Sequence, residues 1–323
     1  LINTLKAFGV AAAIAGTLTS ASAQDYPNRP VRFIVPHGAG GGTDVVARVF
    51  AQKMSTGLGQ AVVVENKVGG GSQVGAEYVS SAPADGYTVL FASSSILTLP
   101  YLRNTKYELS RDFVPIGEVG SGNFALVVSP NFPARTLAEF IAVAKAKPSQ
   151  YTYGSAGVGS ANHLAGELLK SRVGIDVRHI PYKSSGEMSQ ALMAGQIDSS
   201  IDVLITEKEL INTGKVRALA TTGPERDADF PNVPTMNEGK LVPGGYEMTF
   251  WFGVFVPVKT PAAVVERLRR EFAVAMKDPE VIRRVKSFSL KPSTSTPAQF
   301  QAAIIAEQIV WKKVITDNGI RLD

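Results

Sequence analysis

The sequence predicts an α/β protein of two domains, each a mostly parallel sheet flanked by helices, and three observations support this. From residue 26 onward, short runs rich in β-branched residues alternate with segments whose apolar residues recur at helical spacing. This alternation is the order of β-α-β units. A second series of the same kind begins near residue 123. Finally, segments 124–141 and 252–268 share one order of strand, proline-bearing turn and helix. This repeat indicates that the chain crosses between the domains twice.

The first unit follows the alternation closely. It begins with a strand at 31–36, and a helix at 43–59 then ends at a glycine. A strand at 61–66, a helix at 70–82 and a strand at 87–95 complete it.

The second unit repeats the pattern after the first crossing. Its predicted strands are 151–157, 177–182, 197–203 and 216–222, and its predicted helices are 136–148, 161–174 and 186–196. A strand near 251–258 then leads into helices that continue to Asp323. We therefore place residues 24–122 and 245–323 in domain 1 and residues 123–244 in domain 2. A cleft between them would face the carboxyl ends of strands from both sides, where ligands bind in such sheets.

Composition excludes several classes of function. The chain of 323 residues contains no cysteine, so disulfides and thiolate chemistry are excluded. Its net charge of +5 comes from scattered lysines and arginines without a basic stripe, which argues against nucleic-acid binding. Its three histidines have no metal-ligand spacing such as H-E-x-x-H. We therefore expect no metal and no cofactor.

The N-terminal segment is typical of an export signal. Residues 7–18 are apolar but too short to span a bilayer, and Lys6 precedes them. The small residues Ala21, Ser22 and Ala23 then form a cleavage-site pattern. The alternative is an ordinary N-terminal helix. We predict a signal peptide at residues 1–23, cleaved near Ala23, and an exported mature protein.

A glycine-rich loop follows the first predicted strand, in the stretch VPHGAGGGTDVVARV. Glycine lets backbone N–H groups approach a bound group, and a following helix N-terminus favours an anion. The P-loop and dinucleotide patterns both fail here, and the carboxylate of Asp44 would oppose a polyanion. A smaller anion could be held by backbone N–H groups and Thr43, or the loop is a turn capped by Thr43. The candidate residues are His37, Ala39, Gly40, Gly41, Thr43 and Asp44.

A second loop of small residues lies in the other half, in the stretch YGSAGVGSANHLAGELL. It too joins a predicted strand to a helix, so the two loops could close on one ligand from opposite sides. Its candidate residues are Ser155, Ala156, Gly157, Ser160 and His163. The stretch is not a G-x-S-x-G nucleophile turn, because Gly154 and Tyr153 precede Ser155. We assign no catalytic residue.

Taken in order and spacing, these stretches resemble the Bug-type (Bordetella uptake gene) extracytoplasmic solute receptors, the substrate-binding components of tripartite tricarboxylate transporters. The resemblance covers the whole mature chain, including DGYTVL, HIPYKSSGEMSQALMAGQIDSSID, GKVRALATTG and WFGVFVPVKTP. It implies a periplasmic binding protein of type II, the Venus flytrap fold, with a carboxylate in the interdomain cleft. It also implies delivery to a two-subunit membrane permease and no enzymatic activity.

Carried over by position, the family's binding loops fall on residues 37–44 and 155–163. The loop after the third strand falls on residues 93–95, with Ser93 and Ser94 as candidate residues, and Asp202 lies at a strand end. Two departures concern the ligand. This chain has PHGAGG where the family often has PFAPGG, and Val203 where asparagine commonly follows the aspartate. The ligand is therefore open between aliphatic and aromatic carboxylates, with dicarboxylates favoured.

Individual residues keep alternative interpretations. At the family's aromatic position, His37 would add a hydrogen-bond donor, and an anionic ligand would favour its charged form; otherwise it is a loop residue. His163 contacts the ligand or bonds to neighbouring backbone, and His179 is interpreted as packing. Asp44 and Asp202 would fix loop amides or water.

Alternative functions are the ligand-binding input of a two-component sensor kinase and an exported α/β hydrolase-like enzyme. We expect a monomer.

Overall fold

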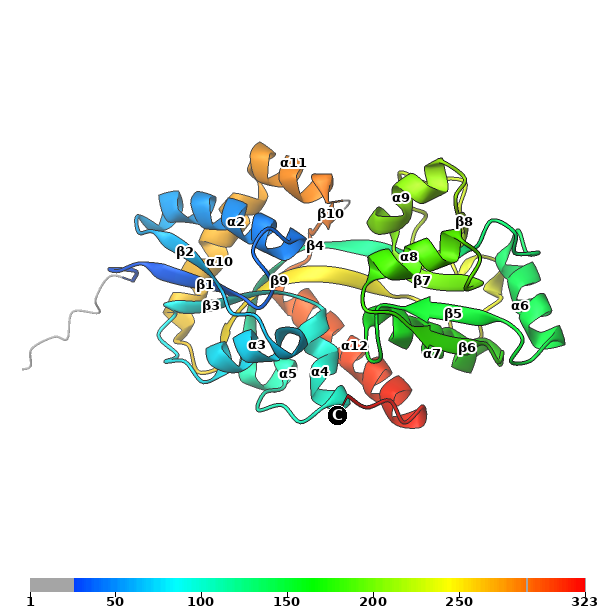
Figure 1. Cartoon of the computed structure of the whole chain (residues 1–323). Coiled ribbons are helices and arrows are strands. Elements are labelled where there is room, and N and C mark those ends of the chain that lie inside the picture. The colour runs from blue at the N-terminus through cyan, green and yellow to red at the C-terminus, as the bar shows by residue number, and fades with distance from the viewer. Residues whose placement is uncertain (1–25, 289, 323) are drawn as a thin grey trace, which may run out of the picture.

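The computed structural model describes residues 26–288 and 290–322 (Figure 1). The predicted signal peptide, residues 1–23, and its cleavage site near Ala23 lie outside these residues. Within the described chain, every helix is too short or too polar to cross a membrane.

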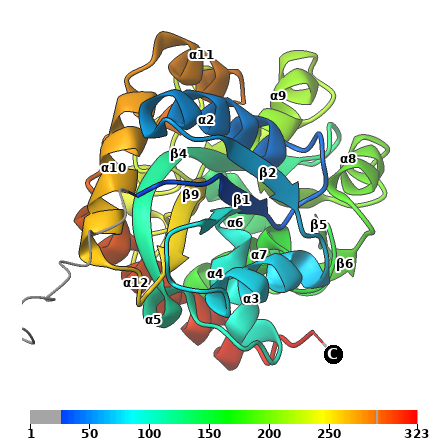
Figure 2. The same ribbon diagram turned by 90° about the vertical axis from the view of Figure 1, so that its left-hand side faces the viewer.

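The first half of the molecule contains a parallel arrangement of three strands. β1 (Val31–Val35) lies between β2 (Val62–Asn66) and β3 (Thr88–Ser93) and pairs parallel with both. Helices α2 (Gly42–Leu58) and α3 (Gln73–Ser80) contact β1 from opposite faces (Figure 2). The short helices η1 (Gly70–Ser72), α4 (Ser95–Leu102) and α5 (Leu109–Asp112) complete this half. The burial of β1, with only Arg32 partly exposed, accounts for its apolar sequence.

A single long strand joins the two halves. β4 (Phe113–Val128) pairs antiparallel with β9 (Thr249–Pro257) as far as Asn123. From Phe124 onward it pairs antiparallel with β7 (Ser199–Val203) and, from Ala125, with β8 (Arg217–Thr221). Glycines interrupt the strand, and at Gly117 a Cβ atom would lie 2.2 Å from the ring of Phe272. Glycine is therefore needed for α10 (Ala262–Met276) to lie this close to the strand.

The second half has its own parallel strands. β5 (Thr152–Ser155) pairs parallel with β6 (Arg178–Pro181) and with β7. Helices α6 (Leu137–Ala146), α7 (Ala161–Val173), α8 (Ser185–Met193), α9 (Leu204–Asn212) and η2 (Glu238–Lys240) surround them. The sheets are therefore mixed: parallel within each half, as the β-α-β pattern predicts, and antiparallel where β4 and β9 connect the halves.

The C-terminal elements return to the first half, and one of them reaches further. Stacking of Phe272 on Phe50, with ring centroids 5.3 Å apart, joins α10 to α2, and α11 (Pro279–Ser287) also contacts α2. The short β10 (Lys291–Pro292) pairs with β4. Helix α12 (Pro297–Asp317) contacts α4 and β4 and also α7 of the second half. The sequence places residues 245–323 with the first domain, whereas α12 bridges both halves.

Candidate functional site

A cavity of about 570 Å³ lies between the two halves. Both glycine-rich loops, the end of β3 and helix α12 contribute to its wall. Its size is in the range of small-molecule sites. Four of the residues predicted from the sequence line it: Thr43, Ser93, Ser94 and Ser160.

The first glycine-rich loop is held by Asp44. The Asp44 carboxylate, 1 % exposed, accepts a 2.9 Å hydrogen bond from the N–H of Gly40. It also accepts bonds from the Arg48 guanidinium and from Asn66 Nδ2. Burial opposes ionisation, yet these hydrogen bonds together hold the pKa of Asp44 below its ordinary value. The carboxylate therefore fixes a loop amide, one of the roles that the sequence suggested for it.

The remaining residues of this loop differ in exposure. Ala39, Gly40 and Gly41 are exposed and do not belong to the cavity lining. Gly41 is the N-cap of α2, so Thr43 lies in the first helical turn, where it is buried and lines the cavity. Gly40 has φ of +80°, a conformation that glycine adopts without strain.

His37 lies beside a group of serine hydroxyls. Its Nε2 atom is 3.2 Å from Ser72 Oγ and 3.2 Å from Ser93 Oγ. Ser95 Oγ lies 2.9 Å from Ser93 Oγ and 3.3 Å from Ser72 Oγ. Burial lowers the pKa of His37, and its Nδ1 atom has no partner among the described residues. His37 itself does not line the cavity; it contacts Ser93, which does.

In the second loop, most of the predicted residues bond to one another. Ser155 is fully buried, and its Oγ lies 2.6 Å from His179 Nε2. Gly157 contributes its carbonyl, which accepts hydrogen bonds from the hydroxyls of Ser155 and Ser160. Ser160 caps α7 and lines the cavity, whereas Ser155, Ala156 and Gly157 do not.

The histidines of this half stack on each other. The rings of His163 and His179 are 3.9 Å apart and nearly parallel, at 11°. His163 Nδ1 accepts a 3.0 Å hydrogen bond from the Gly159 N–H. Of the two roles considered for His163, this contact corresponds to bonding with the neighbouring backbone. Burial lowers the pKa of both rings, and the neighbouring His163 helps to bring the pKa of His179 to about 4. Both rings are therefore neutral at pH 7.

Asp202 lies behind the cavity wall. It is 1 % exposed, and its Oδ1 accepts hydrogen bonds from Asn162 Nδ2 at 2.6 Å and from the Val203 N–H at 2.7 Å. Its Oδ2 and Glu207 Oε2 are buried without a hydrogen-bond donor among the described residues. Burial raises the pKa of both carboxyl groups. Val203, at the position of the family departure, itself lines the cavity.

Much of the lining comes from residues that the sequence analysis did not identify. Ser95 and Gly159 belong to the loops at 93–95 and 155–163 that were predicted, whereas Arg103 lies outside every predicted loop. No ligand-binding role was predicted for the residues that form the large apolar surfaces, which are Phe124, Leu164, Met248, Phe250, Phe252 and Trp311.

Glu307 of α12 also lines the cavity, and both of its carboxylate oxygens are occupied. Oε2 accepts a hydrogen bond from Trp251 Nε1 and Oε1 accepts one from Trp311 Nε1, each 3.0 Å long. Burial raises the pKa of Glu307 against the effect of these two bonds. No group of three or more metal-ligating side chains occurs among the residues that the structure describes. The site is thus an apolar cavity with hydroxyls and two charged side chains.

Comparison with known proteins identifies the relatives of this chain. Residues 46–320 match the family "TctC: Tripartite tricarboxylate transporter family receptor". The protein BugT of Bordetella pertussis is 34 % identical over 321 residues, which cover 98 % of each chain.

Three solved structures are similar over at least 90 % of this chain and 99 % of their own. The periplasmic binding protein BugD is 33 % identical, with a TM-score of 0.72. Rpa4515 of R. palustris, solved with adipate, is 32 % identical with a TM-score of 0.74. A TctC solute-binding protein from Polaromonas, without ligand, is 28 % identical with a TM-score of 0.82. The predicted family resemblance and the α/β periplasmic binding fold are thereby confirmed.

Proposed function

Because this chain belongs to the family of tripartite tricarboxylate transporter receptors, we propose that it is a periplasmic protein that binds a small dicarboxylate, aliphatic or aromatic. In this proposal it works as a monomer and delivers the ligand to a membrane permease of two subunits. The family is one of solute receptors rather than enzymes.

One observation carries this proposal: hydroxyl groups from both halves line one cavity. Thr43 and Ser93 belong to the first half and Ser160 to the second. Hydroxyl groups donate hydrogen bonds to carboxylate oxygens, and such charge-assisted bonds contribute about 1.5–3 kcal/mol each. Micromolar binding requires about 8 kcal/mol in total, which a few such bonds and apolar burial supply. Adipate in the related Rpa4515 structure supports a carboxylate as the ligand class.

A ligand screen by thermal unfolding tests the proposal. Adipate, malate, citrate and terephthalate are compared with glucose and ATP as non-carboxylate controls. A ligand at a hundred times its dissociation constant stabilises the folded protein by about 2.7 kcal/mol. We expect at least one carboxylate to raise the melting temperature, with calorimetry confirming one site per chain. A shift with glucose or ATP alone would overturn the proposal.

A further inference from the structure

The cavity contains two charged side chains whose hydrogen-bonding states differ. Each carboxylate oxygen of Glu307 accepts a hydrogen bond from an indole N–H group. Arg103 has one long hydrogen bond, 3.4 Å from Nη1 to the Gly70 carbonyl. Its Nε atom is buried without a hydrogen-bond partner among the described residues. Among the described residues, the Nη1 and Nη2 donors make no hydrogen bond other than the one to Gly70, so the guanidinium has unused capacity to bind an anion.

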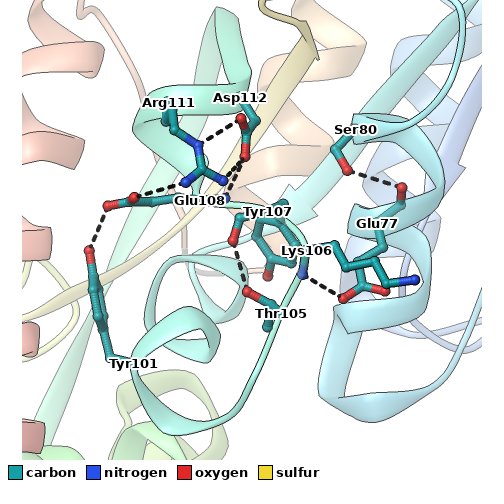
Figure 3. A network of polar contacts seen from close by, with 9 residues as sticks. All are labelled: Glu77, Ser80, Tyr101, Thr105, Lys106, Tyr107, Glu108, Arg111 and Asp112. Carbon is teal, nitrogen blue, oxygen red and sulfur yellow. Dashed lines mark hydrogen bonds and ion pairs between the residues drawn. The ribbon is translucent and has the colours of Figure 1, made fainter.

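The segment around Arg103 is fixed on both sides. Before it, Tyr101 donates a hydrogen bond to Glu108 Oε1 (Figure 3). Tyr101 also accepts a hydrogen bond from Gln308 of α12. After it, the Lys106 N–H donates to Glu77 Oε1 (Figure 3). Arg103 therefore extends into the cavity from an anchored backbone, which reduces the entropy lost when it binds a ligand.

The cavity offers an anion two separate kinds of partner. Hydroxyls at the end of β3 and in the two glycine-rich loops can hold one carboxylate. Phe250, Phe252 and Trp311 form an apolar wall that suits a hydrocarbon body. Arg103 supplies the planar fork of N–H donors that binds a carboxylate through two parallel hydrogen bonds.

We propose that Arg103 binds the second carboxylate of a dicarboxylate with an apolar spacer and so selects diacids over monoacids. The inference rests on the proposed function, because the first carboxylate is held at the hydroxyls. Arg103 is a specificity residue in this assignment. The chemistry suits an aliphatic or aromatic spacer that can lie against the aromatic wall.

Matched pairs of acids test the assignment: adipate against hexanoate, and terephthalate against benzoate. Affinities are measured by calorimetry for wild type, Arg103→Gln and Arg103→Lys. Arg283→Gln is the control, because it removes the same charge from an exposed position on α11, outside the cavity lining. Melting temperatures verify that each variant is folded.

We expect Arg103→Gln to weaken diacid binding about ten- to a hundred-fold, the range for loss of hydrogen bonds to a charged group. Monoacid binding should change by less than about threefold, as for a substitution outside the contacts. Arg103→Lys should lie between, because the ammonium keeps the charge without the planar fork. If Arg103→Gln does not fold, the same diacid-specific loss in Arg103→Lys is the deciding measurement.

Equal losses for diacid and monoacid, or no loss, would overturn the role of Arg103 while leaving the receptor function intact. Equal losses would instead indicate that Arg103 only supports the Gly70 carbonyl. If the wild type binds malate or citrate but none of these four acids, the apolar spacer and the role of Arg103 are overturned and the receptor function stands. If no carboxylate of either set binds, both proposals are overturned.

Discussion

The imidazole Nε2 of His37 lies 3.2 Å from the hydroxyl oxygen of Ser93. Through this contact, a histidine that does not line the cavity positions a serine that does. The ring is half-buried, and burial lowers its pKa below the ordinary value of 6.5. It is therefore neutral at pH 7 in the absence of ligand.

The first prediction concerns His37→Phe. The phenyl ring cannot bond to Ser93, so ligand affinity should fall by about 0.5–1.5 kcal/mol, the range for a neutral hydrogen bond. Because His37 is neutral above its lowered pKa, the loss should be equal for adipate and hexanoate and constant between pH 7 and 8. Calorimetry at both pH values measures it. A diacid-selective loss, with wild-type affinity falling from pH 6 to 8, would instead indicate a charged His37 in contact with the ligand.

Tryptophan fluorescence should report binding through Trp311. The chain has only two tryptophans; Trp311 lines the cavity and Trp251 does not. Both donate to Glu307, so replacement of either by phenylalanine removes one hydrogen bond of the same kind. We expect a saturable emission change with ligand in wild type and Trp251→Phe, and little change in Trp311→Phe. A full response in Trp311→Phe would show that the ligand does not lie against this wall.

Gly159→Ala should destabilise the protein more than Gly174→Ala. Both glycines have positive φ, +75° and +65°, where an alanine costs about 1–2 kcal/mol. A Cβ at Gly174 meets nothing within 4 Å, whereas at Gly159 it lies 2.9 Å from Leu322. Overpacking of that kind adds about 1–3 kcal/mol. Urea unfolding of the two variants measures the difference, and equal losses would show that Leu322 moves aside freely.

Glu207→Gln should flatten the dependence of stability on pH. Burial raises the pKa of Glu207 to about 7, and the neighbouring Asp202 carboxyl adds to this effect. The hydrogen bond from Ser189 acts in the opposite direction. Between about pH 4.5 and 7 the folded protein keeps a proton that the unfolded chain releases, so stability falls as pH rises and levels off above 7. Because glutamine does not titrate, Glu207→Gln removes this loss of stability at higher pH.

The melting temperature of Glu207→Gln at pH 8 should therefore exceed that of wild type by a few degrees, at about 2–4 °C per kcal/mol. Glu209→Gln is the control, because Glu209 is exposed on the same helix. An unchanged slope between pH 4.5 and 7 in Glu207→Gln would contradict the buried-proton assignment.

Ligand binding should close the two halves about the strands that connect them. β4 pairs with β9 in the first half and with β7 and β8 in the second, so this strand is the natural hinge. Small-angle scattering should give a smaller radius of gyration with saturating ligand. An unchanged scattering profile would argue for a rigid cleft. The division into two separately moving domains remains a prediction.

Much of the fold was predictable because it depends on local periodicity. The strand at residues 31–36 and the helix at 43–59 appear as β1 and α2 with shifts of one residue at their ends. β4 was harder to predict, since glycines at 117, 120 and 122 interrupt the alternation over its first half. Its pairing with β9 compensates for the weak local preference.

By itself, the sequence determined the family, the α/β fold and the two glycine-rich loops, because these depend on residue type and short spacing. Only the tertiary structure decided which side chains line the cavity. Ser155 forms a hydrogen bond with His179, and His163 forms one with Gly159, so neither side chain lines the cavity. Trp311 lines the cavity although its helix lies far along the chain. The periodicity of a segment indicates which face of a helix or strand is apolar. Which element packs against that face depends on contacts between residues far apart in the sequence, and local spacing does not specify these contacts.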